Sequence, residues 1–170
     1  MSTSDLYILN KKSTTHLAEF QNGWGSAPFC WMQLSVKYLG KEFNLLNPTP
    51  TWKLAGQGRL QRFELIVLKM TFDRAYIPLA NLSEAGAACI EFGTSTDITH
   101  KKMVNHWPAI GRTLQKASKR KYRPHVRGVS LSCTSVADCW GANVQDWIEG
   151  AWSYFEELPS TPPVEEAQHG

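Results

Sequence analysis

Residues 58–92 read GRLQRFELIVLKMTFDRAYIPLANLSEAGAACIEF, and we expect the rest of the chain to pack around them. Apolar side chains recur at helical spacing on two faces of its first half: Phe63, Ile66, Val67 and Met70 on one, and Leu60, Leu65, Leu68 and Phe72 on the other. A helix that is apolar on nearly all sides is a buried one. We therefore predict a central helix in which Phe63, Val67 and Met70 are fully buried.

The same stretch predicts a second helix after a proline. Pro78 should stop or kink the first helix, because proline lacks the backbone donor and clashes with the preceding turn. Asn81 is a plausible N-cap with Glu84 three residues on. The run that follows should bury Leu82, Ala85, Cys89 and Phe92.

Two β-type runs precede this unit and one follows it. Residues 5–9 and 15–21 read as a β-hairpin closed by a polar turn. Residues 125–136 have the alternating, β-branched pattern of a strand, with Val129, Leu131 and Cys133 on one side. We predict that these runs share a small antiparallel sheet.

Further helices are predicted on both sides of residues 58–92. One covers residues 27–39, where Ser26 is the N-cap, Pro28 lies in the first turn and Gly40 ends the helix. Its apolar face would carry Phe29, Met32, Val36 and Leu39, with Trp31 and Tyr38 towards the other side.

The remaining segments complete the predicted chain path. The segment 40–58 reads as an extended surface connection. A helix over residues 100–119, capped by Thr96 or Asp97, should kink at Pro108. Residues 143–158 predict a closing helix with an apolar stripe of Val144, Trp147, Ile148, Ala151 and Phe155. The fold class is α+β, a small antiparallel sheet packed against about five helices.

Length and composition suit one domain. The chain has 170 residues, of which 42% are hydrophobic and 19% are charged, as in soluble globular proteins. We expect a single domain over residues 1–158 and a disordered tail over 159–170. Neither a long apolar run nor a secretory signal is apparent, so we expect a cytoplasmic protein with no membrane partner, in the host cytoplasm if it is viral.

The four cysteines predict no metal site and no cofactor. They stand at positions 30, 89, 133 and 139, with no CxxC pair. Reduced, mostly buried thiols are expected. An alternative is a cysteine-dependent enzyme, in which His125 activates Cys133 and Asp138 orients the imidazole, with Cys139 close by. Proximity along the chain is weak support for it, because catalytic groups usually come from distant segments.

Charge is divided unevenly along the chain. Residues 98–137 contain nine Lys or Arg and no acidic residue, whereas residues 138–170 contain seven acids and no Lys or Arg. We define the basic segment as residues 116–127, KASKRKYRPHVR. Its candidate binding residues are Lys116, Lys119, Arg120, Lys121, Tyr122, Arg123 and Arg127. Such a cluster can meet an acidic protein face or phosphates, or it can balance the acidic C-terminal helix of the same chain.

Seven tryptophans suggest that some aromatic side chains are displayed. The candidate anchors for a partner are Trp24, Trp52, Trp107 and Trp140. Trp24 stands between two glycines in residues 22–26, NGWGS, a tight turn that either buries the indole or displays it.

Two patterns in residues 1–90 carry a resemblance: YILNKK with HLAEFQNGWGSAPFCW, and RFELIVLKMTFDRAYIPLANLSEAG. They resemble small phage- or prophage-encoded proteins of unassigned function. The resemblance implies a context rather than an activity. Such proteins often bind and block a host protein, and components of antiviral defence, such as a CRISPR complex, are among the targets that it implies.

These observations favour a non-enzymatic binding protein that inhibits a host factor stoichiometrically. Its partner would be a host protein or a protein–nucleic acid complex, steered by the basic segment and anchored by aromatic side chains. A nucleic-acid-binding accessory protein is an alternative, although no helix-turn-helix, RNP, KH or zinc-finger motif is present. The basic segment then supports non-specific phosphate contact only. Oligomeric state cannot be inferred from these patterns.

Overall fold

The chain begins with the predicted β-hairpin. In the computed structural model, which describes residues 2–40, 48–72, 74–95, 104–133, 147–150 and 152, β1 spans Thr3–Asn10 and β2 spans Thr14–Gln21. The turn between them closes with a hydrogen bond from the Asn10 amide to the Ser13 carbonyl, at 2.8 Å. The register of the two strands shifts by one residue between Leu6 and Tyr7, which leaves Leu17 without a partner opposite.

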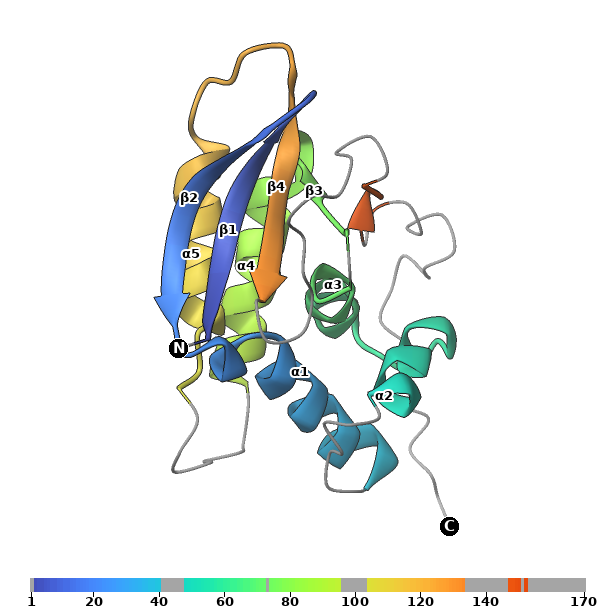
Figure 1. Cartoon of the computed structure of the whole chain (residues 1–170). Coiled ribbons are helices and arrows are strands. Elements are labelled where there is room, and N and C mark those ends of the chain that lie inside the picture. Colours follow the sequence, from blue (N-terminus) through green and yellow to red (C-terminus); the bar gives the residue numbers. More distant parts are fainter. Residues whose placement is uncertain are drawn as a thin grey trace.

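The hairpin belongs to a four-stranded antiparallel sheet of order β2-β1-β4-β3. β4 is Val126–Cys133, close to the predicted strand, and β3 is the two-residue strand Ile77–Pro78. Helices α4 and α5 lie against one face of the sheet, which we call the inner face (Figure 1). The predicted α+β class is therefore confirmed.

Five α-helices and several short turns complete the described fold. The α-helices are α1 (Ala27–Leu34), α2 (Thr49–Lys53), α3 (Arg62–Met70), α4 (Leu82–Thr94) and α5 (Trp107–Ser118). The short elements are the 3-10 turns η1 (Gly23–Gly25), η3 (Leu54–Gly56) and η4 (Leu79–Asn81), and the π-helical turn η2 (Ser35–Leu39). None of the described helices combines the length and the apolar character needed to cross a bilayer.

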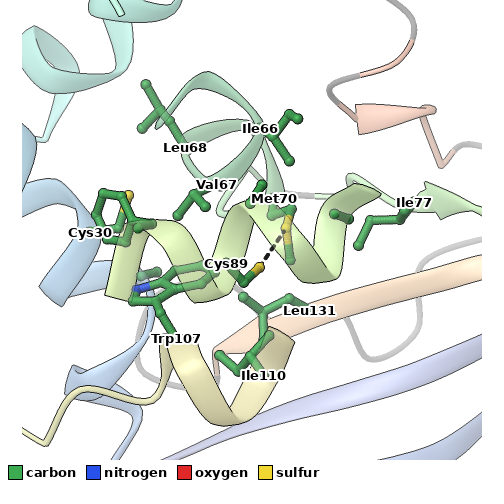
Figure 2. Close-up of a cluster of buried hydrophobic side chains, with 14 of the residues drawn as sticks. Cys30, Ile66, Val67, Leu68, Met70, Ile77, Cys89, Trp107, Ile110 and Leu131 are labelled. Carbon is green, nitrogen blue, oxygen red and sulfur yellow. Dashed lines mark hydrogen bonds between the residues drawn. The ribbon is translucent and has the colours of Figure 1, made fainter. Parts of the chain in front are cut away.

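The core lies where α3 and α4 meet the inner face of the sheet. Val67 and Met70 are buried, at 0% and 3% exposure, and the Cys89 thiol lies 3.6 Å from the Met70 sulfur (Figure 2). On α4, all four side chains predicted to be buried are buried: Leu82, Ala85, Cys89 and Phe92. Phe63 is the exception to the predicted core. It is only half-buried, because it lies at the edge of a hollow between α3 and α4.

The ends of α3 differ from the prediction. A capping box starts the helix: the Gln61 side chain accepts from the backbone of Glu64, whose carboxylate accepts from the Gln61 amide at 3.1 Å. The helix ends at Met70, well before Pro78, and the Thr71 hydroxyl donates to the Leu68 carbonyl. Pro78 instead lies in the edge strand β3, where a missing donor is tolerated. The predicted side-chain cap from Asn81 on α4 does not form.

The buried face of α1 also differs from the prediction. Trp31 is 1% exposed and its indole donates to the Thr71 hydroxyl at 2.8 Å, whereas Val36 is 42% exposed. The α-helix gives way at Ser35 to the π-helical turn, which rotates the following residues away from the regular spacing. Gly40 ends this turn in the left-handed conformation, as predicted. The Ser26 side chain bonds to the Gly23 carbonyl and does not cap the helix.

Two other predicted segments are wrong where the structure describes them. The supposed extended connection contains α2 and η3, because Pro50 lies in the first helical turn while Thr51 and Leu54 are buried. Within the supposed closing helix, Ile148 forms a parallel bridge with Ala75, so these residues are extended. The rest of that helix, the predicted cap at Thr96 or Asp97 and the tail lie outside the described residues.

Helix α5 is shorter than the predicted helix over 100–119. It begins at Trp107, so Pro108 occupies the first turn and causes no kink. Residues 104–106 have no helical assignment, and 100–103 lie outside the described residues.

Candidate functional site

The basic segment joins the end of α5 to the start of β4 and is held in place at several points. The Arg120 amide donates to the Ala117 carbonyl at 3.1 Å, and the Val126 amide donates to the Arg123 carbonyl at 3.0 Å. Cations near a helix C-terminus also interact favourably with the helix dipole, which suits Lys116 and Lys119. These contacts hold the backbone that carries the charged side chains in place. All six of its Lys and Arg side chains are exposed: Lys116, Lys119, Arg120, Lys121, Arg123 and Arg127.

Two further cations lie at the same end of the sheet, and sequence reasoning missed them. Lys11 and Lys12 form the exposed turn between β1 and β2. Antiparallel pairing places Asn10 opposite Val126, so this turn lies beside the start of β4 (Figure 1). We call this combined surface, Lys11, Lys12 and the basic segment, the basic end. The signal was present in the sequence, since antiparallel pairing of the predicted hairpin with the strand near 130 brings the two turns together.

None of the basic-end cations is neutralised by a carboxylate in the described part of the chain. The ion pairs found there are His16–Asp5, Lys37–Glu64 and Arg62–Glu84. Glu149, from the acidic C-terminal region, accepts a hydrogen bond from the Tyr76 hydroxyl at 3.0 Å. Burial and the contact with Glu149 raise the pKa of Tyr76, and the charge of nearby Arg127 opposes this shift, which places this one cation close to that contact. Most of the acidic region lies outside the described residues, so internal charge balance by it stays a prediction.

Tyr122 supports the basic segment rather than extending from it. Its ring packs against the hydrophobic core, and its hydroxyl donates to the Ala117 carbonyl at 2.7 Å. Burial raises the pKa of this hydroxyl, although the charge of Arg120 opposes the shift. The residue predicted to contact a partner therefore anchors the loop on α5.

The predicted aromatic anchors differ in how far they are exposed. Trp24 and Trp52 are 40% and 36% exposed, so two of the four are displayed. Trp107 is fully buried, because its indole packs against Phe92 and donates to the Ser26 carbonyl at 3.1 Å. The prediction that Trp107 is a displayed anchor is therefore wrong. Trp140 lies outside the described residues.

The displayed tryptophans lie far from the basic end. Trp24 follows β2, whose other end carries the turn with Lys12, so the eight residues of β2 separate them by about 23 Å at roughly 3.3 Å per residue. Trp52 lies on α2, which Figure 1 shows at the other end of the molecule from the turn between β1 and β2. It packs edge-on against Trp31 and Phe72. It borders an apolar hollow of about 350 Å³ lined by Thr49, Trp52, Lys53 and Phe72. The basic end and the displayed tryptophans therefore form separate surfaces.

The alternative thiol–imidazole pair is not assembled. His125 precedes the first residue of β4 and is exposed, whereas Cys133 is the last residue of the strand and is 4% exposed. An extended chain of this length holds them about 26 Å apart, at roughly 3.3 Å per residue. The Cys133 thiol instead donates to the Gly23 carbonyl at 3.4 Å. Asp138 and Cys139 lie outside the described residues.

Cys30 and Cys89 are also buried, and neither forms a disulfide in the described part of the chain. Burial raises the pKa of both Cys30 and Cys89, which disfavours the reactive thiolate. Among the described residues, no group of three His, Cys, Asp or Glu is arranged to hold a metal ion.

A buried carboxylate network beside α3 was not anticipated. Glu64 is 2% exposed and accepts hydrogen bonds from the Lys37 ammonium at 3.1 Å and from the Tyr38 hydroxyl. Burial, followed by the bond to Glu64, raises the pKa of Tyr38. A cavity of about 30 Å³ adjoins Glu64 and Gln33, whose Nε2 has no partner in the described part of the chain. That space could hold one water. The network pairs the buried Glu64 carboxylate with the Lys37 ammonium and so links η2 to α3.

Comparisons with protein-family models, with curated proteins and with solved structures found no match to this chain.

Proposed function

We propose that this protein binds a host factor and inhibits or redirects it stoichiometrically, by docking its basic end on an acidic protein face. One observation carries the proposal: eight Lys and Arg side chains from two distant segments gather at one end of the sheet, and none pairs with a described carboxylate. Surface charges left unpaired in this way steer association with an oppositely charged partner.

The character of the basic end favours a protein partner over single-stranded nucleic acid. Proteins that bind single strands combine cations with exposed aromatic rings on which bases stack. The Tyr122 ring is packed against the core, and no exposed Phe, Tyr or Trp lies among the residues of the basic end. Its cations remain suited to a carboxylate-rich surface.

The kind of partner rests on the resemblance to phage- and prophage-encoded proteins in residues 1–90. A small binding protein in that context fits a host target, and a component of antiviral defence such as a CRISPR complex is the class that we propose to test first. The distant surfaces around Trp24 and Trp52 would then contribute only with a large partner.

A capture experiment from a bacterial host lysate tests this proposal. The tagged protein is compared with the double variant Lys121→Glu/Arg123→Glu and with the control Arg74→Glu/Arg112→Glu, which makes the same charge change at exposed positions outside the basic end and away from Trp24 and Trp52. We expect a protein that is retained after nuclease treatment by the parent and the control but not by the basic-end variant. Loss of all partners after nuclease would indicate nucleic acid binding. Equal capture by all three proteins would contradict the proposal.

A further inference from the structure

The two edges of the sheet are protected very differently. At one edge, β3 has only two residues, and the chain beside it is bridged to Ile148 through Ala75. At the other edge, β2 has eight residues, most of them exposed, and no described strand pairs with its outer side (Figure 1). β2 also lacks a lysine or proline, the residues that often prevent an edge strand from pairing with another chain. The backbone groups on its outer side therefore form a template for another strand, except at Gln21, whose carbonyl accepts a hydrogen bond from the His106 imidazole at 2.6 Å.

The register shift in the hairpin determines which β2 residues share a face. His16 and Glu19 lie opposite Tyr7 and Asp5, so both are on the outer face although they are three residues apart. Thr14 and Gln21 are also on the outer face, opposite Leu9 and Thr3. Thr15 and Phe20 lie opposite Ile8 and Ser4, on the inner face.

We infer that β2 pairs with β2 of a second copy, antiparallel about a two-fold axis between Leu17 and Ala18, to form a continuous eight-stranded sheet. In an antiparallel pair, opposing side chains lie on the same face. This register places Thr14 opposite Gln21, Thr15 opposite Phe20, and His16 opposite Glu19, and each of these pairs matches in face. A shift of one residue would put inner-face positions opposite outer-face ones.

Side-chain chemistry agrees with this register. The Glu19 carboxylate lies opposite the imidazole of His16 twice, once on each side of the axis. The His16 side chain is 51% exposed while its Nε2 bonds to Asp5 at 2.8 Å, so the ring is held in place yet accessible. Leu17 and Ala18 meet at the axis, and both are only half-buried in the single copy. A single added strand pair is a small interface, so we expect a concentration-dependent dimer.

Sedimentation velocity over a range from about 1 μM to about 1 mM tests the dimer. The variant Glu19→Lys puts a cation opposite His16 and a lysine on the edge, and it should weaken dimerisation at least about tenfold. Glu91→Lys, on an exposed position of α4, makes the same charge change and should have no effect. Equal unfolding temperatures would show that both variants are folded. A monomer throughout the range, or a dimer that Glu19→Lys leaves intact, would overturn the inference.

A cross-link tests the register independently of Glu19. Thr14→Cys and Gln21→Cys are prepared separately, each with Cys139→Ser, and mixed under mild oxidation. Paired antiparallel positions have Cα atoms about 4.5–5.5 Å apart, which a disulfide spans. We expect a disulfide dimer from the mixture and none from either variant alone, because identical positions lie about 23 Å apart at roughly 3.3 Å per residue. No cross-link in the mixture would overturn the proposed pairing.

Discussion

Met70 and Val36 were both predicted to lie on the buried face of a helix, but they differ in exposure. Met70 is 3% exposed in the core, whereas Val36 is 42% exposed on the π-helical turn. Met70→Ala should lower the unfolding free energy by about 2–5 kcal/mol, because it leaves a cavity. Val36→Ala, the control, should change it by no more than about 0.5 kcal/mol. Urea denaturation measures both, and equal effects would contradict the observed packing of this face.

Phe63 shows which part of the burial pattern could not be predicted from the sequence. Helical spacing correctly identified Val67 and Met70 as core residues, but it placed Phe63 with them. Its exposure depends on how far α4 lies from α3, where a hollow of about 330 Å³ remains. Periodicity within one helix carries no information about the position of its neighbour.

Tyr76 should make stability depend on alkaline pH. Burial and its bond to Glu149 raise the pKa of this hydroxyl from 10.0 to about 12. The unfolded chain releases the proton at lower pH than the folded chain, so the stabilisation is complete below pH 10 and is lost as pH rises towards 12. Tyr76→Phe should therefore flatten the decline in unfolding free energy between pH 10 and 12, measured by denaturation at each pH. An unchanged decline would show that this hydroxyl does not titrate as the structure requires.

At the level of elements, α4 and α5 cross at two glycines. A Cβ on Gly86 would lie 2.8 Å from the Gly111 carbonyl oxygen, and one on Gly111 would lie 2.5 Å from the Gly86 carbonyl oxygen. Gly111→Ala should destabilise the fold by about 1–3 kcal/mol through overpacking, although alanine favours a helix. Gly56→Ala is the matched control, because a Cβ there meets nothing within 4 Å. Thermal unfolding of the pair tests the crossing, and a stabilised Gly111→Ala would refute its closeness.

Elements with strong local signals were predicted well. The hairpin, α4 and β4 follow from alternation, helical spacing and turn residues, and the structure places them close to the predicted bounds. The failures come from tertiary contacts. Trp147 and Ile148 belong to the apolar stripe of the predicted helix over residues 143–158. Ile148 nevertheless forms backbone hydrogen bonds with Arg74 and Tyr76. Short helices such as α2 bury too few residues to leave a periodic pattern.

For the whole molecule, the sequence revealed one of the two segments that form the candidate site. The run of cations in residues 116–127 is visible as charge alone. The contribution of Lys11 and Lys12 depends on the pairing of β1 with β4, which joins residues more than a hundred positions apart. The prediction that the basic segment and the displayed tryptophans act together now requires a partner large enough to reach both surfaces, because the fold separates Trp24 and Trp52 from the basic end. Charge is thus the feature that distinguishes the basic end.

The affinity of the captured host protein for charge-reversed variants tests the central claim most directly. Biolayer interferometry at low and physiological salt would compare the parent, Lys121→Glu/Arg123→Glu and the control Arg74→Glu/Arg112→Glu. The basic-end variant should bind at least about tenfold more weakly, mainly through slower association, because like charges then face each other across the interface. The control should bind as the parent does. Unchanged affinity of the basic-end variant at low salt, in a protein that unfolds at the parental temperature, would contradict the account.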